Sequence, residues 1–210
     1  MKIRILILFL ITILTSCSSP RVIKFDESYS NLTNLIYTEP IYEFASQEEK
    51  TSKSGQYFMK YTNQTLDSIF TVDSLKYKIH KKIAIKDKDK LTATLIPKLN
   101  KIIEQIQSQN SVEQIKIPKE FYSLNESQFL MFTLIKPNLI SSDKRYPNSI
   151  VLRPSTNSFF VQFSEVYIFI LDFKKDKIAF YGNSSGKLNN LGYRKKIIKD
   201  INSIYDLMKE

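Results

Sequence analysis

The sequence is poor in the residue types on which many folds and active sites depend. Its 210 residues include one cysteine, one histidine, no tryptophan and only 4 glycines. A single cysteine cannot form an intramolecular disulfide, so a disulfide-stapled scaffold is excluded. One histidine and one cysteine also cannot supply the three or four nitrogen and sulfur ligands of a usual zinc site. We therefore expect neither a metal site nor a bound cofactor.

Hydrophobic residues, by contrast, make up 42% of the chain, which is enough to bury a core. This excludes a wholly disordered protein and favours one globular domain. The formal net charge is +10 at pH 7. Such a charge suits nucleic acid, an anionic membrane surface, or solubility alone. The lysines are spread along the whole chain, which is typical of a lysine-rich proteome.

The amino terminus has the layout of a secretory signal peptide. Lys2 and Arg4 form a short positive start, and residues 5–14 are apolar except for Thr12. As a helix, this apolar run covers about 15 Å, half of a hydrocarbon core about 30 Å thick. The run is too short to span a bilayer, but its length fits the apolar region of a cleaved leader.

The residues that follow the apolar run resemble the lipobox of bacterial lipoproteins. They are Leu14, Thr15, Ser16 and Cys17, and Cys17 is the only cysteine. The resemblance implies that a diacylglycerol is attached to the thiol of Cys17 and that signal peptidase II cleaves just before it. The new amino terminus is often acylated as well. An uncleaved signal anchor with an incidental cysteine is the alternative.

This resemblance divides the chain into a signal peptide at 1–16, a lipidated cysteine and short tether at 17–24, and one globular domain at 25–210. Two or three acyl chains would hold the protein almost permanently on a membrane. Ser18, in place of aspartate, is similar to the outer-membrane class of Gram-negative lipoproteins, and residues 18–23 contain no acidic cluster. For a Gram-negative bacterium we therefore expect the periplasmic face of the outer membrane. Export argues against nucleic acid and leaves envelope proteins or anionic lipid head groups as further partners.

The pattern of the domain predicts an α+β fold. Helices are predicted at 64–85, at 90–107 with Pro97 interrupting, and at 195–208. Residues 32–44 indicate an edge strand or irregular segment, and residues 47–54 a polar loop. Short β-rich runs follow at 129–135, 150–152, 159–163, 166–173 and 177–181. We expect an antiparallel sheet with a carboxy-terminal hairpin, packed against two central helices and a closing helix that docks on the sheet.

Catalytic signatures are scarce. The sequence lacks G-x-G-x-x-G, a Walker A loop, H-E-x-x-H, G-x-S-x-G and C-x-x-C. His80 lies in a lysine-rich stretch, where we expect it to be partly exposed. Residues 141–144 match the short S-x-x-K element of serine penicillin-binding enzymes, but without its partner motifs. Asp172 and Glu165 lie about 23 Å apart on one strand, too far for a glycosidase pair. Glu120, Glu126 and Asp143 are the remaining acidic candidates.

Two triplets, at 67–69 and 73–75, resemble the acidic-hydroxyl-apolar signal for O-glycosylation in Bacteroidota, with Ser68 and Ser74 as acceptors. The overall layout also resembles small uncharacterised lipoproteins of that group. We therefore expect an envelope lipoprotein that serves as a binding or assembly module rather than as an enzyme. The alternatives are a hydrolase of cell-wall material or other polymers, and a lipid or lipopolysaccharide carrier.

Overall fold

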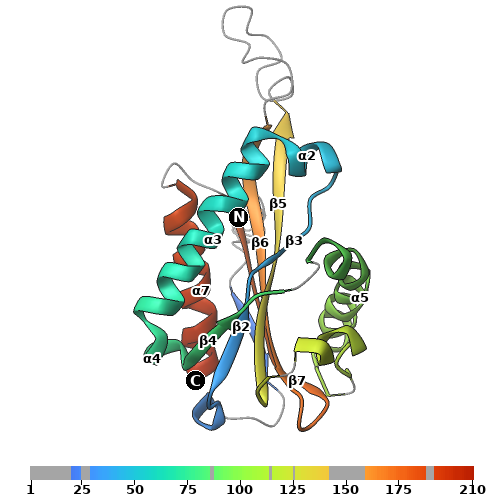
Figure 1. Cartoon of the computed structure of the whole chain (residues 1–210), viewed down its shortest axis with the longest axis vertical. Helices are drawn as coiled ribbons and strands as arrows, with labels where there is room; N and C mark the ends of the chain where they lie inside the picture. Colours follow the sequence, from blue (N-terminus) through green and yellow to red (C-terminus); the bar gives the residue numbers. More distant parts are fainter. Residues whose placement is uncertain are drawn as a thin grey trace, which may run out of the picture.

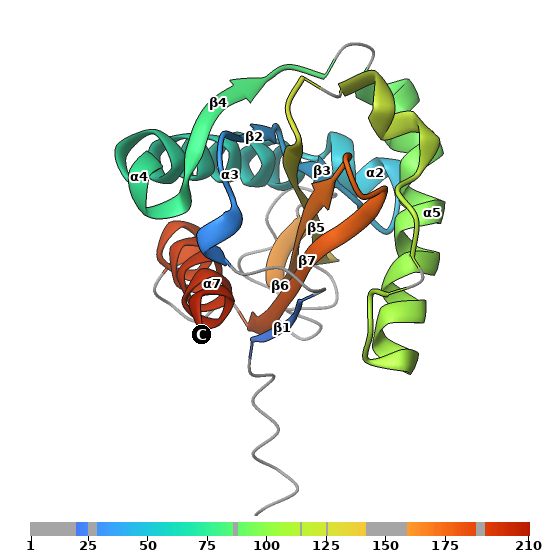
Figure 2. The same cartoon turned by 90° about the horizontal axis from the view of Figure 1, so that it is seen from below.

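The computed structural model describes residues 20–24, 29–85, 88–113, 115–124, 126–141, 159–187 and 192–210. They form three layers, with a central mixed sheet between two layers of helices (Figures 1 and 2). Two long helices, α3 and α7, cover one face, and α5 covers the other. The α+β class predicted from the sequence is confirmed.

The elements follow one another along the chain as strands, helices, long strands and a closing helix. In chain order they are β1 (Arg21–Lys24), η1 (Tyr29–Asn31), β2 (Leu35–Thr38), β3 (Ile41–Tyr42), α2 (Gln47–Thr51), α3 (Lys53–Val72), α4 (Ser74–Tyr77), β4 (Ile79–Ile83), α5 (Lys88–Gln109), η2 (Lys119–Leu124), β5 (Phe129–Ser141), β6 (Phe159–Asp172), β7 (Lys177–Lys187) and α7 (Gly192–Lys209).

The sheet is mixed, so the prediction of an antiparallel sheet is wrong. Its seven strands run in the order β1-β7-β6-β5-β2-β4, and β3 also pairs with β5. The carboxy-terminal part is antiparallel, whereas β2 runs parallel to both β4 and β5, and β3 runs parallel to β5. Parallel neighbours need a crossover connection, which α3 provides between β2 and β4. The longer connection from β2 and β3 to their parallel neighbour β5 runs through α3, β4 and α5.

The predicted hairpin of β6 and β7 is confirmed and lies in the middle of the molecule. Alternate residues of β6 point to opposite faces, so Tyr167 and Phe169 join the core under α5 while Ile168 and Ile170 join the core under α3 and α7. Because the strand is covered on both faces, it has the nearly continuous apolar run that marks a fully buried strand. The runs predicted at 159–163 and 166–173 belong to this one strand.

The helices predicted at 90–107 and 195–208 are also confirmed. The buried side of α5 is lined by Leu95, Leu99, Ile102, Ile103 and Ile106. Pro97 lies inside this helix, on its exposed side. The amphipathic helix α7 docks on β1, β6 and β7 and packs beside α3, as expected from its apolar stripe.

The helix predicted at 64–85 is wrong in its second half. Regular helix α3 ends at Val72, a short turn of α4 follows, and Lys78 then adopts a left-handed conformation with φ of 55°. That residue stops the helix, and the chain continues as β4, which pairs with β2. The apolar spacing of this stretch suits a helix locally, but pairing with a strand forty residues earlier decides its structure.

The polar segment at 47–54 is helical instead of a loop. Ser46 caps α2 by accepting a hydrogen bond from the amide of Glu49 at 3.1 Å, and the carboxylate of Glu49 accepts one from the amide of Ala45. Ser52 caps α3 in the same way through the amide of Gly55. The segment at 32–44, predicted as an edge strand, contains β2, which lies inside the sheet between β4 and β5.

The ends of two predicted segments also differ from the structure. Residues 21–24, which the sequence assigns to the tether, form β1 and pair with β7. The β-rich run predicted at 177–181 extends further, because β7 continues to Lys187. The strand predicted at 150–152 lies outside the described residues.

Candidate functional site

The single histidine does not belong to a catalytic arrangement among the described residues. His80 is exposed on β4, the strand at one edge of the sheet. Its neighbour Lys81 forms an ion pair with Glu126, and Lys82 pairs with Asp67 at 2.8 Å. The cations of this edge are thus engaged with nearby acids, and His80 lies outside that pairing.

Glu165 lies in the middle of β6 and Asp172 at its end, so the two carboxylates are far apart along the strand, as the sequence indicates. Asp172 is buried, and its Oδ1 accepts hydrogen bonds from the amide of Lys174 at 2.9 Å and from the side chain of Gln128 at 3.2 Å. These contacts fasten the turn between β6 and β7. Asp172 is therefore part of the hairpin architecture.

Glu120 lies in η2 and pairs with Lys98 of α5, which ties the two elements together. The hydrogen bond from Lys98, helped by a backbone hydrogen bond, holds the pKa of the Glu120 carboxyl below its usual range. Of the S-x-x-K stretch at 141–144, only Ser141 is described, as the last residue of β5. Asp143 lies outside the described residues.

Polar side chains converge at one end of the α5 face, around Lys136 of β5. We call this group the Lys136 cluster; its members are Glu43, Asn100, Lys136, Glu165 and Tyr167. The Nζ atom of Lys136 donates to Asn100 Oδ1 at 2.7 Å and lies 3.1 Å from Glu43 Oε2. Asn100 in turn donates to Glu43 Oε1 at 2.7 Å. Four separate segments therefore meet at one cation.

The second half of the Lys136 cluster lies on β6, where Glu165 is directly opposite Lys136 in the strand register and Tyr167 is two residues further along. The hydroxyl of Tyr167 donates to Glu165 Oε2 at 2.6 Å, and the ammonium of Lys136 lies 5.5 Å from the centre of the Tyr167 ring. Burial, and then the bond to Glu165, raise the pKa of Tyr167 well above its usual range. The hydroxyl therefore stays protonated and serves as a donor.

Sequence reasoning missed the Lys136 cluster, except for Glu165. Its members are distant in the chain, and only the parallel pairing that carries Glu43 to β5 brings them together. Chemically, the cluster has two carboxylates, one cation and a phenol, the groups that acid–base chemistry would use. Each group is already bonded to another member, so the arrangement stabilises the junction of β3, α5, β5 and β6.

A second buried polar group joins α7 to the sheet. Ser184 of β7 donates to Asp200 Oδ1 at 2.8 Å, and Lys196 donates to the same atom at 2.6 Å. Asp200 is only 3% exposed, so its charge would be costly without these two partners. The serine, the carboxylate and the lysine thus fasten α7 to the sheet.

The glycosylation triplets lie on the α3 side of the molecule. Ser68 and Ser74 are both partly exposed, in α3 and α4. Asp67 accepts hydrogen bonds from Lys82 and, at 3.1 Å, from the hydroxyl of Tyr37. Glycosylation of either serine remains a prediction.

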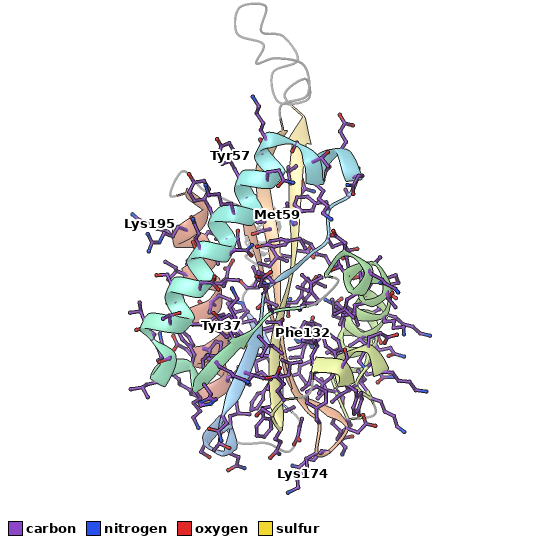
Figure 3. The ribbon with its side chains drawn as sticks, viewed as in Figure 1. Tyr37, Tyr57, Met59, Phe132, Lys174 and Lys195 are labelled. Carbon is purple, nitrogen blue, oxygen red and sulfur yellow. The ribbon has the colours of Figure 1, made fainter. Side chains whose placement is uncertain are left out.

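The outer face of α3 and α4 is unusually apolar. Of the five large hydrophobic side chains that are exposed among the described residues, four lie there: Tyr57, Tyr61, Val72 and Leu75. The rings of Tyr57 and Tyr61 stack with their centres 6.0 Å apart, and Figure 3 shows Tyr57 on the outer side of α3. Leu75 is 94% exposed. We call these four residues the α3–α4 surface.

Val72 and Leu75 share the apolar spacing that predicts a helix at 64–85, yet the structure exposes both side chains. Because α3 ends at Val72 and the chain turns, the continuation of the stripe is rotated away from the sheet. Exposed aromatic and aliphatic side chains grouped on one face are typical of protein–protein contact sites. The α3–α4 surface is therefore the candidate binding site of the domain.

The described residues form neither a candidate metal site nor a helix suited to crossing a membrane. Within the described ranges, no group of three or more His, Cys, Asp and Glu side chains is placed to hold a metal ion. None of the described helices combines the length and apolar character needed to cross a membrane. Cys17 itself precedes the first described residue, Pro20.

No protein-family model and no curated protein matches the chain. Among solved structures, the chain is similar to the PelC dodecamer from Paraburkholderia phytofirmans, with a TM-score of 0.39, 7% identity, and coverage of 89% of this chain and 98% of that one. A single-residue variant of that PelC dodecamer gives a TM-score of 0.38 over the same coverage and at the same identity. Similarity at this level carries no argument about function.

Proposed function

We propose that the protein is a lipid-anchored lipoprotein of the bacterial envelope whose globular domain serves as a binding or assembly module. The observation that carries the first half is the succession of a short apolar run and Leu14, Thr15, Ser16 and Cys17. The resemblance to a lipobox supplies the chemistry: the Cys17 thiol accepts the lipid, and the acyl chains insert into the bilayer.

The position of β1 supports this proposal physically. Its first residue, Arg21, is already hydrogen-bonded into the sheet, only four residues after Cys17. A fully extended tether of that length spans at most about 14 Å. The domain would therefore sit directly on the membrane and meet partners within the envelope.

The α3–α4 surface supports the second half of the proposal. Tyr57 and Tyr61 present two stacked phenols, which give a large contact area at a small cost in side-chain entropy. The groups that resemble catalytic machinery, by contrast, are hydrogen-bonded to their own neighbours in the Lys136 cluster and at Asp200. A binding role fits these observations better than a hydrolase or a lipid carrier.

Metabolic labelling with a clickable fatty acid tests the anchor. The wild-type chain should incorporate the label and fractionate with membranes, whereas Cys17→Ala should do neither and should accumulate with its leader uncleaved. Ser19→Ala is the matched control, because it alters a neighbouring side chain and leaves the thiol. An alanine variant that still incorporates label, or that is still processed, would contradict the proposal.

Site-directed photocrosslinking in living cells tests the binding surface. A photoreactive residue at Tyr61 or Leu75 should give discrete crosslinked species at the envelope, and one at Lys101 on the opposite helical layer should not. Crosslinks of equal yield at all three positions, or none at Tyr61 and Leu75, would argue against a specific partner on this surface. The localisation is tested separately by membrane fractionation, for which Ser18→Asp should shift the protein toward the inner membrane.

A further inference from the structure

The start of α7 carries positive charge where a helix is least suited to it. Arg194 and Lys195 fall in its first turn, which has no acidic residue, and Lys196 and Lys199 follow in the second turn. A helix amino terminus carries a partial positive charge of its own, so cations there are unfavourable. Only Lys196 is compensated, through Asp200.

The other three cations are turned to solvent. Arg194, Lys195 and Lys199 are exposed, and among the described residues no ion pair involves any of them. Figure 3 shows Lys195 extending outward from the upper part of α7. We call these three residues the α7 basic patch. Arg194 and Lys195 are unfavourable at the start of their own helix, and none of the three side chains belongs to the core. Charges of this kind are expected where a partner outside the domain uses them.

The register of the sheet places the α7 basic patch at the end toward which the tether leaves. Gly182 of β7 lies between β1 and α7: a Cβ atom on it would be 3.6 Å from the carbonyl oxygen of Arg21 and in contact with Ile204. Two residues further along β7, Ser184 meets Asp200, one turn earlier in α7. Movement along β7 in this direction therefore leads toward the amino terminus of α7.

Because β1 is antiparallel to β7, with Arg21 opposite Asn183, the same direction is the one in which the chain runs backward from Arg21 to Pro20 and on to Cys17. The patch begins ten residues before Ile204, about 15 Å along the helix. The four residues from Arg21 to Cys17 reach about 14 Å at most. The tether is therefore long enough for a membrane that holds Cys17 to lie level with the α7 basic patch.

We propose that the α7 basic patch binds the anionic phospholipid head groups of the membrane that holds the Cys17 anchor. This inference rests on the proposed lipid anchor and adds a fixed orientation to it. The acyl chains keep the domain at the bilayer, so three cations with weak individual affinity act at a high effective concentration. Helix α3 packs beside α7, and α4 lies at the end of the molecule where α7 finishes (Figure 1). With the start of α7 against the head groups, the α4 end of the α3–α4 surface, with Val72 and Leu75, is left free for a protein partner.

Lysine labelling of the full-length mature protein, purified with its lipid and reconstituted into vesicles, tests the proposal. Vesicles contain either phosphatidylcholine alone or phosphatidylcholine with phosphatidylglycerol. The amine-labelling rate of Lys195 and Lys199 should fall several-fold in the anionic vesicles, since each cation near such a surface gains about fivefold in partitioning. Lys174, at the turn on the opposite end of the sheet, should be labelled equally in both and serves as the internal reference (Figure 3).

Because this comparison needs the lysines themselves, variants are compared by hydrogen exchange of the first turns of α7, which should be slower in the anionic vesicles for the wild type. The variant Arg194→Glu/Lys195→Glu/Lys199→Glu should abolish this difference between the two kinds of vesicle. The matched control Lys101→Glu/Lys116→Glu/Lys119→Glu changes the net charge equally on the other layer and should preserve the difference between the two kinds of vesicle.

The mass of the Cys17 peptide in the same digest reports lipidation. A lipidated protein whose Lys195 is equally labelled in both vesicles overturns the inference and leaves the proposed function intact. Protection that persists in neutral vesicles indicates a protein or self-contact and also overturns it. A peptide without lipid overturns the proposed function, and the inference with it.

Discussion

Gly182 of β7 lies so close to Ile204 of α7 that a Cβ atom on the glycine would stand 2.4 Å from Ile204 Cγ2. Real Cβ atoms do not approach other carbons to this distance, so any side chain at this position would force either the Ile204 side chain or α7 to shift. Both residues are buried, in the core shared by α3, α7 and the sheet. The absence of a side chain at residue 182 thus sets the distance at which α7 docks.

We therefore predict that Gly182→Ala lowers the free energy of unfolding by about 1 to 3 kcal/mol, the usual cost of overpacking a core. Chemical denaturation followed by circular dichroism measures this change. In an Ile204→Ala background, which removes Cγ2, the added methyl group should cost clearly less, because the clash is gone. Equal costs in both backgrounds would show that the contact does not limit docking.

Removal of the Asp200 carboxylate should also be costly. The variant Asp200→Ala leaves the Lys196 ammonium, which is only 16% exposed, without its partner, and leaves Ser184 without an acceptor. We expect a loss of about 2 to 4 kcal/mol in unfolding free energy, toward the lower side of the range for a broken buried ion pair.

Ser184→Ala is the matched control for Asp200→Ala, because it deletes the hydrogen bond and keeps the ion pair. It should cost about 1 kcal/mol. If the two variants lost the same stability, the ion pair with Lys196 would contribute nothing measurable.

The sequence predicts α5, α7 and the β6–β7 hairpin because each of them is recorded in a local pattern. In α7, Ile197, Ile201, Ile204 and Met208 recur at helical spacing and all are buried. In β6, a long run of apolar residues reflects burial on both faces. Such patterns need no knowledge of distant segments.

The elements that the sequence predicts wrongly depend on contacts or signals of a different kind. The stretch from Leu75 to Ile83 keeps helical apolar spacing, yet it turns at Lys78 and pairs in parallel with β2. Parallel pairing depends on segments forty or more residues apart, and no local pattern records it. The helix α2 and the start of α3 are polar, but the caps at Ser46 and Ser52 were local signals that an interpretation based on hydrophobicity missed.

The same distinction holds for the candidate sites. Cys17 is predicted from adjacent residues, because a lipobox is a contiguous motif. The Lys136 cluster brings Glu43, Asn100 and Glu165 together from three distant segments, so it emerges only when the strand order is known. The α3–α4 surface results from the end of a helix, which exposes Val72 and Leu75 instead of burying them.

The lowered pKa of Glu120 gives a prediction about pH. A carboxyl with a folded-state pKa below its unfolded value stabilises the protein above the unfolded pKa, and this contribution is lost as the pH falls through the folded-state pKa. Lys98→Met should raise the pKa of Glu120 toward its usual value and shrink this acid-dependent loss. Lys98 is about half exposed, so the effect on stability should stay below about 1 kcal/mol.

Carboxyl carbon resonances of the glutamates, followed through an acid titration by NMR, measure that pKa directly. Lys98→Arg keeps the charge and should keep the pKa low. The backbone hydrogen bond of Glu120 remains in both variants, so Lys98→Met should not restore the full usual value. An unchanged titration in Lys98→Met would show that the ion pair is not formed in solution.

Pro97 provides the opposite kind of change, one expected to stabilise the domain. It lies inside α5, where it has no amide hydrogen to donate to the carbonyl of Ala93, and it is exposed, so its ring contributes little to the core. A proline inside a helix costs about 3 kcal/mol relative to alanine. Part of that cost is relieved where the helix bends around the proline. Pro97→Ala should therefore raise the free energy of unfolding by about 1 to 2 kcal/mol, measured by denaturation.

Asn100→Ala, one turn later in the same helix, is the contrasting variant. It breaks the contacts with Glu43 and Lys136 and should destabilise the domain even though alanine is the better helix former. If Pro97→Ala were destabilising instead, the bend that the proline imposes on α5 would itself be required for packing against the sheet.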